Sequence, residues 1–238
     1  MSENRSLPIA ETFHSIQGEG TYVGTPMHFI RLAGCPVGFK ATEEAATSLG
    51  DNYAPIPSME NGRRASYCKT WDGRRFTCDT DFSCHTYKTV DELIGETWEK
   101  HICLTGGEPL IHQQNLISLG FFQQANARRI VTHIETSGTV MLDKCLRDDS
   151  RYWITIAPKW NFLPLMMQHA NEVKLLVDEN FDVDKFTCYP QTGAQIWVSP
   201  INGEKTVNQE NVQRCLEILK THPTWRLSCQ WHKFLNLR

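Results

Sequence analysis

The chain has 238 residues, of which 40% are apolar and 21% are charged, and its formal net charge is −3. This length suits one domain, or at most two small ones, and it can bury a core without disulfides or metals. The charge gives no case for nucleic-acid binding, and no apolar run reaches the length of a membrane span.

Cysteine use and the first residues indicate the compartment. The start, Met1 to Leu7, is polar and lacks a signal-peptide pattern, so we expect a cytoplasmic protein. The nine cysteines are then thiols, available for packing or for metal. Four lie in polar, loop-like sequence: Cys35, Cys68, Cys78 and Cys84. Five lie beside apolar residues and are predicted to be buried: Cys103, Cys145, Cys188, Cys215 and Cys229.

The chain up to residue 135 contains three predicted strands, two predicted helices and a long polar segment. A strand over 28–33 runs into Gly34-Cys35. From Pro36 to Thr77 no apolar period persists, which predicts a long loop that is either functional or partly disordered. Thr89 and Glu92 form a possible capping box for a helix that ends near Trp98. A strand over 101–104 ends at two glycines, and a helix over 115–127 precedes a strand over 129–135.

The second half is predicted to contain four strands and one long helix. The strands are 153–157, 172–177, 195–198 and 225–229. The helix begins near Asn208 and ends before Pro223, with apolar residues at i, i+3, i+4 and i+7. Strands that alternate with helices predict βαβ units and a parallel sheet, whose sites gather at the carboxyl ends of the strands.

The polar cysteines suggest an iron–sulfur centre. Three thiolates leave one iron of a four-iron cluster open for an exogenous ligand such as S-adenosylmethionine. Cys35 and Cys78 are suited to provide two of them. Their spacing alone leaves zinc, or plain thiols, as alternatives.

The residues around these cysteines narrow the choice. The motifs, in chain order, are Glu11 to Gly20, Gly24-Thr25-Pro26, Arg31 to Gly38, Cys78 to Asp81, Thr105 to Pro109, Glu135 to Gly138, Ala157-Pro158-Lys159 and Ser228 to Lys233. Together they resemble the 7-carboxy-7-deazaguanine synthase family, over nearly the whole chain except Phe39 to Thr77. Gly106-Gly107-Glu108-Pro109 alone is typical of the radical S-adenosylmethionine superfamily.

The resemblance implies a fold and a reaction. We expect one α/β domain over residues 1–238, an incomplete β/α barrel with an insertion at about 39–77. It would form a homodimer and convert 6-carboxy-5,6,7,8-tetrahydropterin to 7-carboxy-7-deazaguanine with loss of ammonia, in 7-deazapurine (queuosine-type) biosynthesis. Its cofactors would be a [4Fe–4S] cluster, S-adenosylmethionine and Mg²⁺, with a flavodoxin or ferredoxin as electron donor and neither nucleic acid nor membrane as partner.

One feature departs from the family, which often has Cys-x3-Cys-x2-Cys. Phe39 and Arg75 occupy the two positions where a middle thiol would stand. Cys68 and Cys84 are the alternatives, and we favour Cys68 because the family places its last ligand directly before Asp-Thr, which makes Cys78 the third. The Asp72-Gly73 turn signal would fold Cys68 back beside Cys78 as a hairpin.

The resemblance also assigns the other site residues. Cofactor contacts would be Thr77, Asp79, Gly106, Gly107, Glu108, Ser137, Ala157, Pro158, Lys159, Ser199, Pro200, Ile201 and Asn202. Substrate contacts would be Ile16, Gln17, Gly18, Glu19, Arg31, Thr105, Glu135, His232 and the terminal Arg238, where the family commonly has proline. The metal ligands would be Cys35, Cys68 and Cys78 for iron and Thr80 for Mg²⁺.

Plainer alternatives stand beside these assignments. The strand-end glycines also suit an ordinary tight turn. Another small radical enzyme, such as a glycyl-radical activase, would share Gly-Gly-Glu-Pro but would not need Gln17, Glu19 and His232. A zinc-binding interaction module would use Cys68, Cys78, Cys84 and His85.

Overall fold

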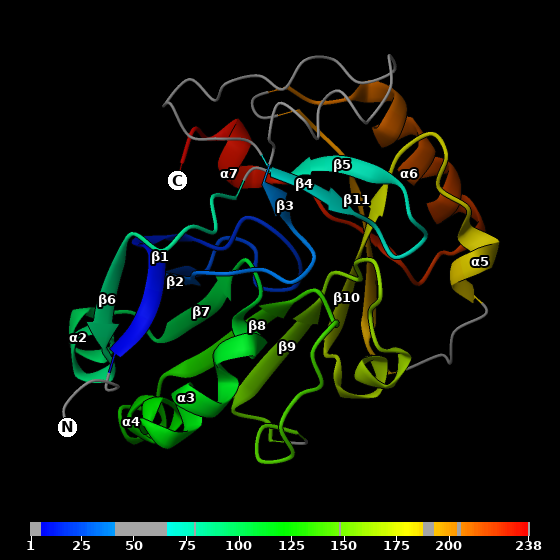
Figure 1. Cartoon of the computed structure of the whole chain (residues 1–238). Helices are drawn as coiled ribbons and strands as arrows, with labels where there is room; N and C mark the ends of the chain where they lie inside the picture. The colour runs from blue at the N-terminus through cyan, green and yellow to red at the C-terminus, as the bar shows by residue number, and fades with distance from the viewer. Residues whose placement is uncertain are drawn as a thin grey trace.

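The fold is an open sheet flanked by helices, seen in the computed structural model of Figure 1. The structure describes residues 6–40, 66–78, 80–147, 149–187, 193–203 and 206–237. The large sheet consists of β1 (Ser6–Ile16), β2 (Pro26–Leu32), β6 (Thr86–Thr89), β7 (His101–Gly106), β8 (Val131–Thr136), β9 (Tyr152–Ile156), β10 (Glu172–Val177), β11 (Gln195–Pro200) and β12 (Arg226–Leu227). A small sheet consists of β3 (Phe39–Lys40), β4 (Ser66–Lys69) and β5 (Arg75–Cys78).

The strand order shows an incomplete barrel. The order is β12-β11-β10-β9-β8-β7-β2-β1-β6, and the seven strands from β12 to β2 pair in parallel. β1 and β6 add to one edge in antiparallel pairings, and β12 forms the other edge, so the sheet does not close. This confirms the predicted α/β fold.

The described helices lie mainly against one face of the sheet. They are α2 (Val90–Glu96), α3 (Gln113–Ser118), α4 (Phe121–Ala127), α5 (Val183–Thr187), α6 (Gln209–Thr221) and α7 (Trp231–Phe234), with short 3₁₀ turns η1 (Pro109–His112) and η2 (Pro164–His169). Figure 1 shows α3 and α4 beside β7–β9, and α6 beside β11. The apolar side chains of the central strands pack toward the helices, Leu104, Ile134 and Ile154 among them.

Alternation along the strands places polar side chains on the inner face of the sheet. Neighbours of the core residues point the other way because the side-chain period of a strand is two. Thr105, Glu135, Thr155 and Lys174 are therefore inner-face residues, and each is at least partly buried. One face of the sheet is therefore apolar and packs against the helices, and the inner face carries polar side chains that can bind ligands.

Most predicted elements are present. The capping box holds: Thr89 accepts a hydrogen bond from the Glu92 amide, and the Glu92 carboxylate accepts one from the Thr89 amide. The last long helix has Asn208 as its N-cap. β10 has the predicted bounds, and the other predicted strands differ by a few residues at their ends.

Two predictions about elements were wrong. The single helix predicted over 115–127 is two helices, because Gly120 adopts a left-handed conformation with φ +79° between α3 and α4. The first strand, β1, was not predicted at all. Its burial alternates irregularly, in keeping with the shift in its pairing register between Ile9 and Glu11.

The polar segment after Cys35 contains a hairpin rather than only a loop. β4 pairs antiparallel with β5, and Cys68 stands opposite Phe76. Gly73 has φ +89° at the tip, which confirms the turn predicted at Asp72-Gly73. The hairpin lies across the sheet at the ends of β9 and β10, where Thr70 bridges Lys159 and the Trp160 amide donates to the Lys69 carbonyl at 3.1 Å.

The apolar-flanked cysteines follow the prediction only in part. Cys103 and Cys215 are buried, Cys229 is half-buried and Cys145 is exposed. Cys145 follows Lys144 in a surface turn, so its prediction was wrong. Cys188 lies outside the described residues. In the part of the chain that is described, no helix has both the length and the apolar character to cross a bilayer.

Candidate active site

Two adjoining cavities open at the carboxyl ends of the parallel strands. The polar cavity, of about 430 Å³, is lined by Gln17, Arg31 and His232 among others. The thiol cavity, of about 210 Å³, is lined by Cys35 and Lys159 among others. Six residues line both cavities: Glu19, Thr80, Thr105, Gly106, Glu135 and Gln230. A group bound in one cavity would therefore lie next to a group bound in the other.

Three thiols line the thiol cavity: Cys35, Cys68 and Cys78. Cys35 follows the end of β2, and the other two lie on the hairpin. Because Cys68 pairs with Phe76 and Ser66 pairs with Cys78, both hairpin thiols point to the same face of the small sheet. The register of one hairpin thus brings two thiols toward the third.

The surroundings of these thiols suit a metal cluster. Burial, and then nearby thiols, raise the pKa of Cys68 to about 11, and burial raises the pKa of Cys35. Without metal the protons stay on, so a bound metal would have to displace them. Three thiols around one cavity fit a four-iron cluster with one open iron, since each thiolate binds a different iron.

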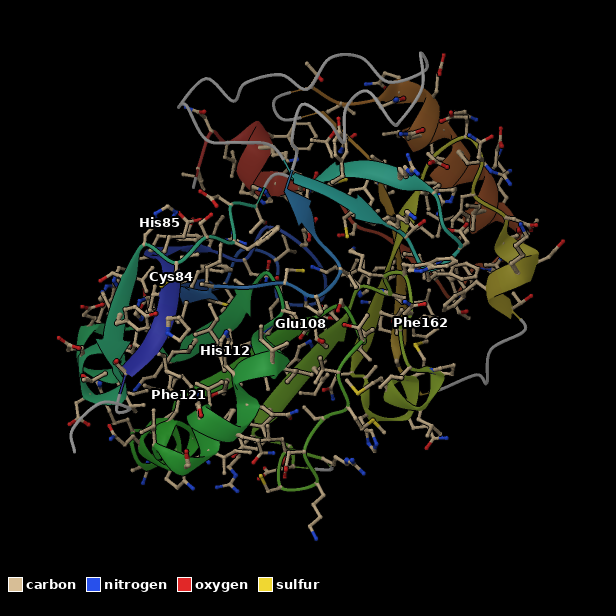
Figure 2. All side chains as sticks on the ribbon, in the orientation of Figure 1. Cys84, His85, Glu108, His112, Phe121 and Phe162 are labelled. Carbon is tan, nitrogen blue, oxygen red and sulfur yellow. The ribbon has the colours of Figure 1, made fainter. Side chains whose placement is uncertain are left out.

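Cys84 lies outside this group. It is exposed, and its thiol donates to the Thr86 carbonyl at 3.4 Å. Figure 2 shows Cys84 and His85 beside β6 at the edge of the molecule, away from Glu108 at the end of β7. Unlike Cys68 and Cys78, which the zinc-module alternative would combine with it, Cys84 does not line the thiol cavity.

The glycines after β7 allow the backbone to pack closely against the Cys35 loop. A Cβ at Gly107 would lie 2.1 Å from the Gly34 carbonyl oxygen and 2.6 Å from the Cys35 Cβ. A Cβ at Gly106, where φ is +139°, would meet the Leu32 carbonyl oxygen at 2.2 Å. The turn that follows β7 therefore requires glycine at both positions.

Replacing Gly107 with alanine is expected to destabilise the protein by about 1–3 kcal/mol, because the added methyl group must displace the Cys35 loop. Urea denaturation measures the change. The control is Gly95→Ala in α2, where no atom lies within 4 Å, and which is expected to stabilise by roughly 0.5–1 kcal/mol. Equal stabilities for the two variants would contradict the close packing of the glycine turn.

The buried Glu108 side chain connects the ends of β7 and β8 by hydrogen bonds. It is fully buried, and its carboxylate accepts hydrogen bonds from the Leu110 amide (3.0 Å), the Ser137 amide (2.8 Å) and the Thr136 hydroxyl (2.8 Å), and another from the Ser137 hydroxyl. Burial raises its pKa, and the bonds from Ser137 oppose that shift. Glu108 does not line either cavity, but Ser137, which it holds, lines the thiol cavity.

Lys174 organises the carboxylates between the two cavities. Its ammonium group donates to Glu19 at 2.7 Å and to Glu135 at 3.4 Å. Gln17 donates to Glu135 at 3.1 Å and accepts from the Glu19 amide at 3.2 Å. The five side chains of this carboxylate network are Gln17, Glu19, Thr105, Glu135 and Lys174, since Thr105 also donates to Glu135 at 3.3 Å.

The charges in this network reinforce one another. Burial opposes the charge on Lys174, but Glu135 and Glu19 outweigh it and raise the pKa of Lys174. Burial likewise opposes the charge on Glu135, and Lys174 outweighs it, so the pKa of Glu135 falls below its usual value. The Glu135 carboxylate is thereby held as a hydrogen-bond acceptor at the border of the cavities, where Glu19 accepts a bond from the same ammonium group.

Arg31 lies on the wall of the polar cavity. Its Nε donates to Glu11 at 2.9 Å, and its terminal nitrogen donates to the Thr80 hydroxyl at 3.1 Å. The guanidinium lies 5.9 Å from the centre of the Phe13 ring. Arg31 is therefore fixed in place but keeps donors for an anion in the cavity.

The C-terminal segment closes the polar cavity. The Trp231 amide donates to the Gly18 carbonyl at 3.0 Å, and a Cβ at Gly18 would lie 2.2 Å from Nδ1 of His232. Gly18 thus lets α7 pack against the β1–β2 loop, so that His232 lines the polar cavity.

Most predicted site residues line a cavity, but several do not. The polar cavity adds Ile16 and Gly18, and the thiol cavity adds Gly107, Ala157 and Ser199. Thr77, Pro158, Pro200, Ile201 and Asn202 line neither. Thr77 is exposed because it alternates with the inward-facing Cys78. Asp79 and Arg238 lie outside the described residues.

The sequence analysis missed several lining residues: Phe13, Phe29, Thr155, Lys174, Gln230 and Lys233. Lys174 had a usable signal, since it is a lysine inside an otherwise apolar strand, where a buried charge requires partners. The two phenylalanines had none, because their pattern is that of ordinary core residues.

Comparison with known proteins identifies the family. The sequence matches no family model. It is 32% identical to the 7-carboxy-7-deazaguanine synthase of Buchnera aphidicola subsp. Schizaphis graminum, over 97% of this chain and 99% of that one. It is 30% identical to the Escherichia coli K12 enzyme of that name, over 97% and 98% of the two chains.

The fold agrees with these sequences. The crystal structure of QueE from Escherichia coli superimposes with a TM-score of 0.64 and 26% identity, over 98% of this chain and 100% of the other. These relatives favour the synthase over the activase and zinc-module alternatives. With its open barrel and its thiol and polar cavities side by side, this chain belongs to the 7-carboxy-7-deazaguanine synthase family.

Proposed function

We propose that the chain converts 6-carboxy-5,6,7,8-tetrahydropterin to 7-carboxy-7-deazaguanine with loss of ammonia, as a step of queuosine-type 7-deazapurine biosynthesis. The observation that carries the proposal is the junction between the cavities. Three thiols line one cavity, an arginine and a histidine line the other, and the Glu19 and Glu135 carboxylates line both.

Cys35, Cys68 and Cys78 would hold a [4Fe–4S] cluster in the thiol cavity. With S-adenosylmethionine on the open iron, the cluster would supply the electron that breaks a C–S bond of the sulfonium and so releases a carbon radical. Phe76 of the hairpin and Phe82 add apolar side chains to the lining of this cavity.

S-adenosylmethionine would lie along the strand ends that line the thiol cavity. The glycine turn at Gly106 and Gly107 lets a ligand approach the backbone. Ser137 and Ser199 offer hydroxyls, and Lys159 is a partly buried cation suited to a carboxylate. These five positions support the predicted cofactor site.

The pterin would occupy the polar cavity. Glu19 and Glu135, which both accept hydrogen bonds from Lys174, are acceptors for its N–H groups, and Gln17 offers both a donor and an acceptor. Arg31 would pair with the substrate carboxylate. His232, on the segment that closes the cavity, lies where it can hold a proton near the substrate.

Thr80 would provide the protein ligand for Mg²⁺, with substrate oxygens and water completing the octahedron. Its hydroxyl lies in both cavities and accepts a hydrogen bond from Arg31, so the cation would bind only together with the anionic substrate. The enzyme would work as a cytoplasmic homodimer that receives electrons from a flavodoxin or ferredoxin.

Arg31→Ala is expected to weaken pterin binding by roughly tenfold to a hundredfold, because a charge-assisted pair with the substrate carboxylate is lost. Binding of S-adenosylmethionine should be nearly unchanged. Separate anaerobic titrations of the two ligands measure this, with Arg75→Ala on the hairpin as the exposed control. Equal losses for both ligands would indicate that Arg31 acts through Glu11 as a structural residue.

Anaerobic turnover tests the proposed function. The reconstituted protein is mixed with 6-carboxytetrahydropterin, reductant, S-adenosylmethionine and Mg²⁺, and the expected products are 7-carboxy-7-deazaguanine and ammonia. Omitting Mg²⁺ tests its role separately. Cleavage of S-adenosylmethionine without formation of the deazaguanine would refute the assigned substrate.

A further inference from the structure

We propose that Arg74, at the tip of the β4–β5 hairpin, is a positioning residue that orders Cys68 for cluster binding. This inference rests on the proposed function, because it concerns the same thiol cavity. It adds a residue remote from the cluster thiols, in the segment from Phe39 to Thr77 that the family resemblance does not cover.

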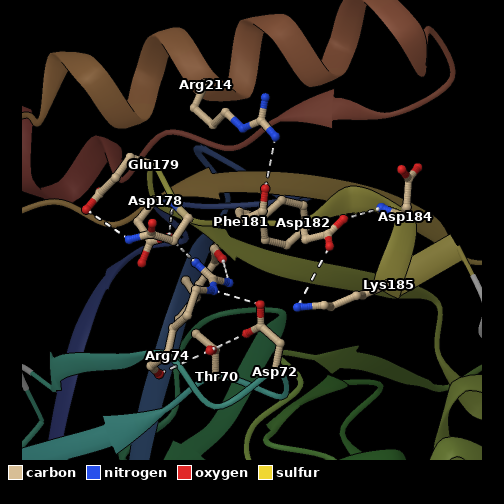
Figure 3. Close-up of polar contacts among 12 residues, drawn as sticks. Thr70, Asp72, Arg74, Asp178, Glu179, Phe181, Asp182, Asp184, Lys185 and Arg214 are labelled. Carbon is tan, nitrogen blue, oxygen red and sulfur yellow. Dashed lines mark hydrogen bonds and ion pairs between the residues drawn. The ribbon is translucent and has the colours of Figure 1, made fainter.

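Arg74 makes contacts in several directions at once (Figure 3). Its Nε donates to Asp72 at 2.7 Å, one terminal nitrogen donates to Asp178 at 2.5 Å, and the other donates to the Leu176 carbonyl at 2.8 Å. The guanidinium also lies 5.1 Å from the centre of the Phe181 ring. One side chain thus joins the hairpin tip to the end of β10.

This attachment is largely shielded from water. The exposed fractions of the three charged side chains are 13% for Arg74, 5% for Asp72 and 15% for Asp178. A cation between two such carboxylates is held more firmly than an exposed ion pair, which contributes little. The bonds from Arg74 therefore fix the tip relative to the large sheet.

The position of Cys68 follows from that of the tip. Cys68 lies two residues before the turn that begins at Thr70. The amide and the hydroxyl of Thr70 both donate hydrogen bonds to the backbone carbonyl of Arg74, at 2.8 Å and 3.1 Å. Trp71 packs against Phe186 with ring centres 5.8 Å apart. With the tip docked, β4 crosses the strand ends and points the Cys68 thiol into the thiol cavity.

A free hairpin would have to be ordered when the cluster binds. A long segment separates Cys35 from Cys68, so closing it with metal–ligand bonds costs chain entropy. When the tip is already docked, part of this chain entropy is lost on folding, and less has to be lost when the cluster binds. Cys35, which follows β2 directly, needs no such aid.

Two measurements on Arg74→Met test the proposal. The first is the rate at which a maleimide alkylates Cys68 in the metal-free protein, read peptide by peptide by mass spectrometry. The second is iron and sulfide bound per chain after anaerobic reconstitution at limiting iron. Arg75→Met is the matched control, because it removes the same charge from an exposed position on β5.

We expect roughly tenfold faster alkylation of Cys68 in Arg74→Met, in line with the loss of charge-assisted hydrogen bonds, and lower iron and sulfide content. Cys35 and the buried Cys103 should react as in the parent, and Arg75→Met should match the parent throughout. If Arg74→Met does not fold, Asp178→Asn removes the negative charge from one of the same bonds with little change in volume and should show the same selectivity for Cys68.

Unchanged Cys68 alkylation and unchanged iron content in Arg74→Met would overturn the proposal. Faster alkylation of Cys103 and Cys68 alike would also overturn it, since that would show general destabilisation. Failure of the proposed function gives a different result: the parent chain would bind no cluster, or Cys68→Ala would bind as much as the parent. The alkylation assay, which needs no cluster, separates the two cases.

Discussion

Cys68→Ala is expected to lose the iron–sulfur cluster, whereas Cys84→Ala should keep it. Cys68 lines the thiol cavity together with Cys35 and Cys78, and Cys84 is exposed and bonded to the Thr86 carbonyl. With two thiolates left, the cluster has too few protein ligands to remain site-differentiated. Iron and sulfide counts on anaerobically reconstituted protein, with cleavage of S-adenosylmethionine, measure the loss.

Cys35→Ala and Cys78→Ala complete this comparison. Each should lose the cluster as Cys68→Ala does, because each removes one of the same three thiols. Cys84→Ala is a matched control, since it deletes one thiol of the same region. Loss of the cluster in Cys84→Ala with retention in Cys68→Ala would show that the wrong thiol had been chosen.

Lys174→Met is expected to destabilise the protein by about 3–5 kcal/mol and to abolish turnover. Lys174 is 7% exposed and donates to both Glu19 and Glu135. Without the ammonium group, the partly buried Glu135 carboxylate loses the cation that keeps its pKa low, and removing one partner of a largely buried ion pair costs about this much. Denaturant unfolding and turnover assays measure the two effects.

Lys100→Met is the control for this change, because Lys100 is exposed and follows α2 at the surface. It should leave both stability and turnover close to the parent. Glu135→Gln in the Lys174→Met background should recover part of the stability, since it removes the charge that lost its partner. A Lys174→Met protein as stable as the parent would contradict the assigned electrostatics of the carboxylate network.

The hairpin changes how the middle thiol of the three, Cys68, reaches the cavity. In the compact spacing often found in the family, neighbouring residues would carry the cluster thiols. Here Phe39 and Arg75 stand at those positions, and Cys68 comes from a separate strand whose tip is bonded to Asp178. Ordering of the hairpin and assembly of the cluster are therefore expected to be linked in this protein.

Local sequence was sufficient where chemistry and geometry are both local. The alternation of strands and helices predicted the parallel sheet, and the Thr89 capping box and the Asn208 cap predicted two helix starts. The Asp72-Gly73 turn predicted the hairpin, and its register then placed Cys68 and Cys78 on one face. Each of these depends on interactions within a few residues, which a single sequence displays directly.

Tertiary structure decided which side chains share a cavity. Lys174, Glu19 and Glu135 are far apart in the chain, and only the parallel alignment of β8 and β10 and the fold of the β1–β2 loop bring them together. The motif of Glu108 predicts a ligand contact. In the structure, however, its carboxylate accepts hydrogen bonds from Thr136 and Ser137, at the end of the neighbouring strand. Arg74 reads as a charged turn residue, and its partners Asp178 and Leu176 lie on β10 or just beyond its end. In each case the deciding bond joins segments that only the folded sheet brings together, and a buried charge can persist only where such a bond compensates its desolvation.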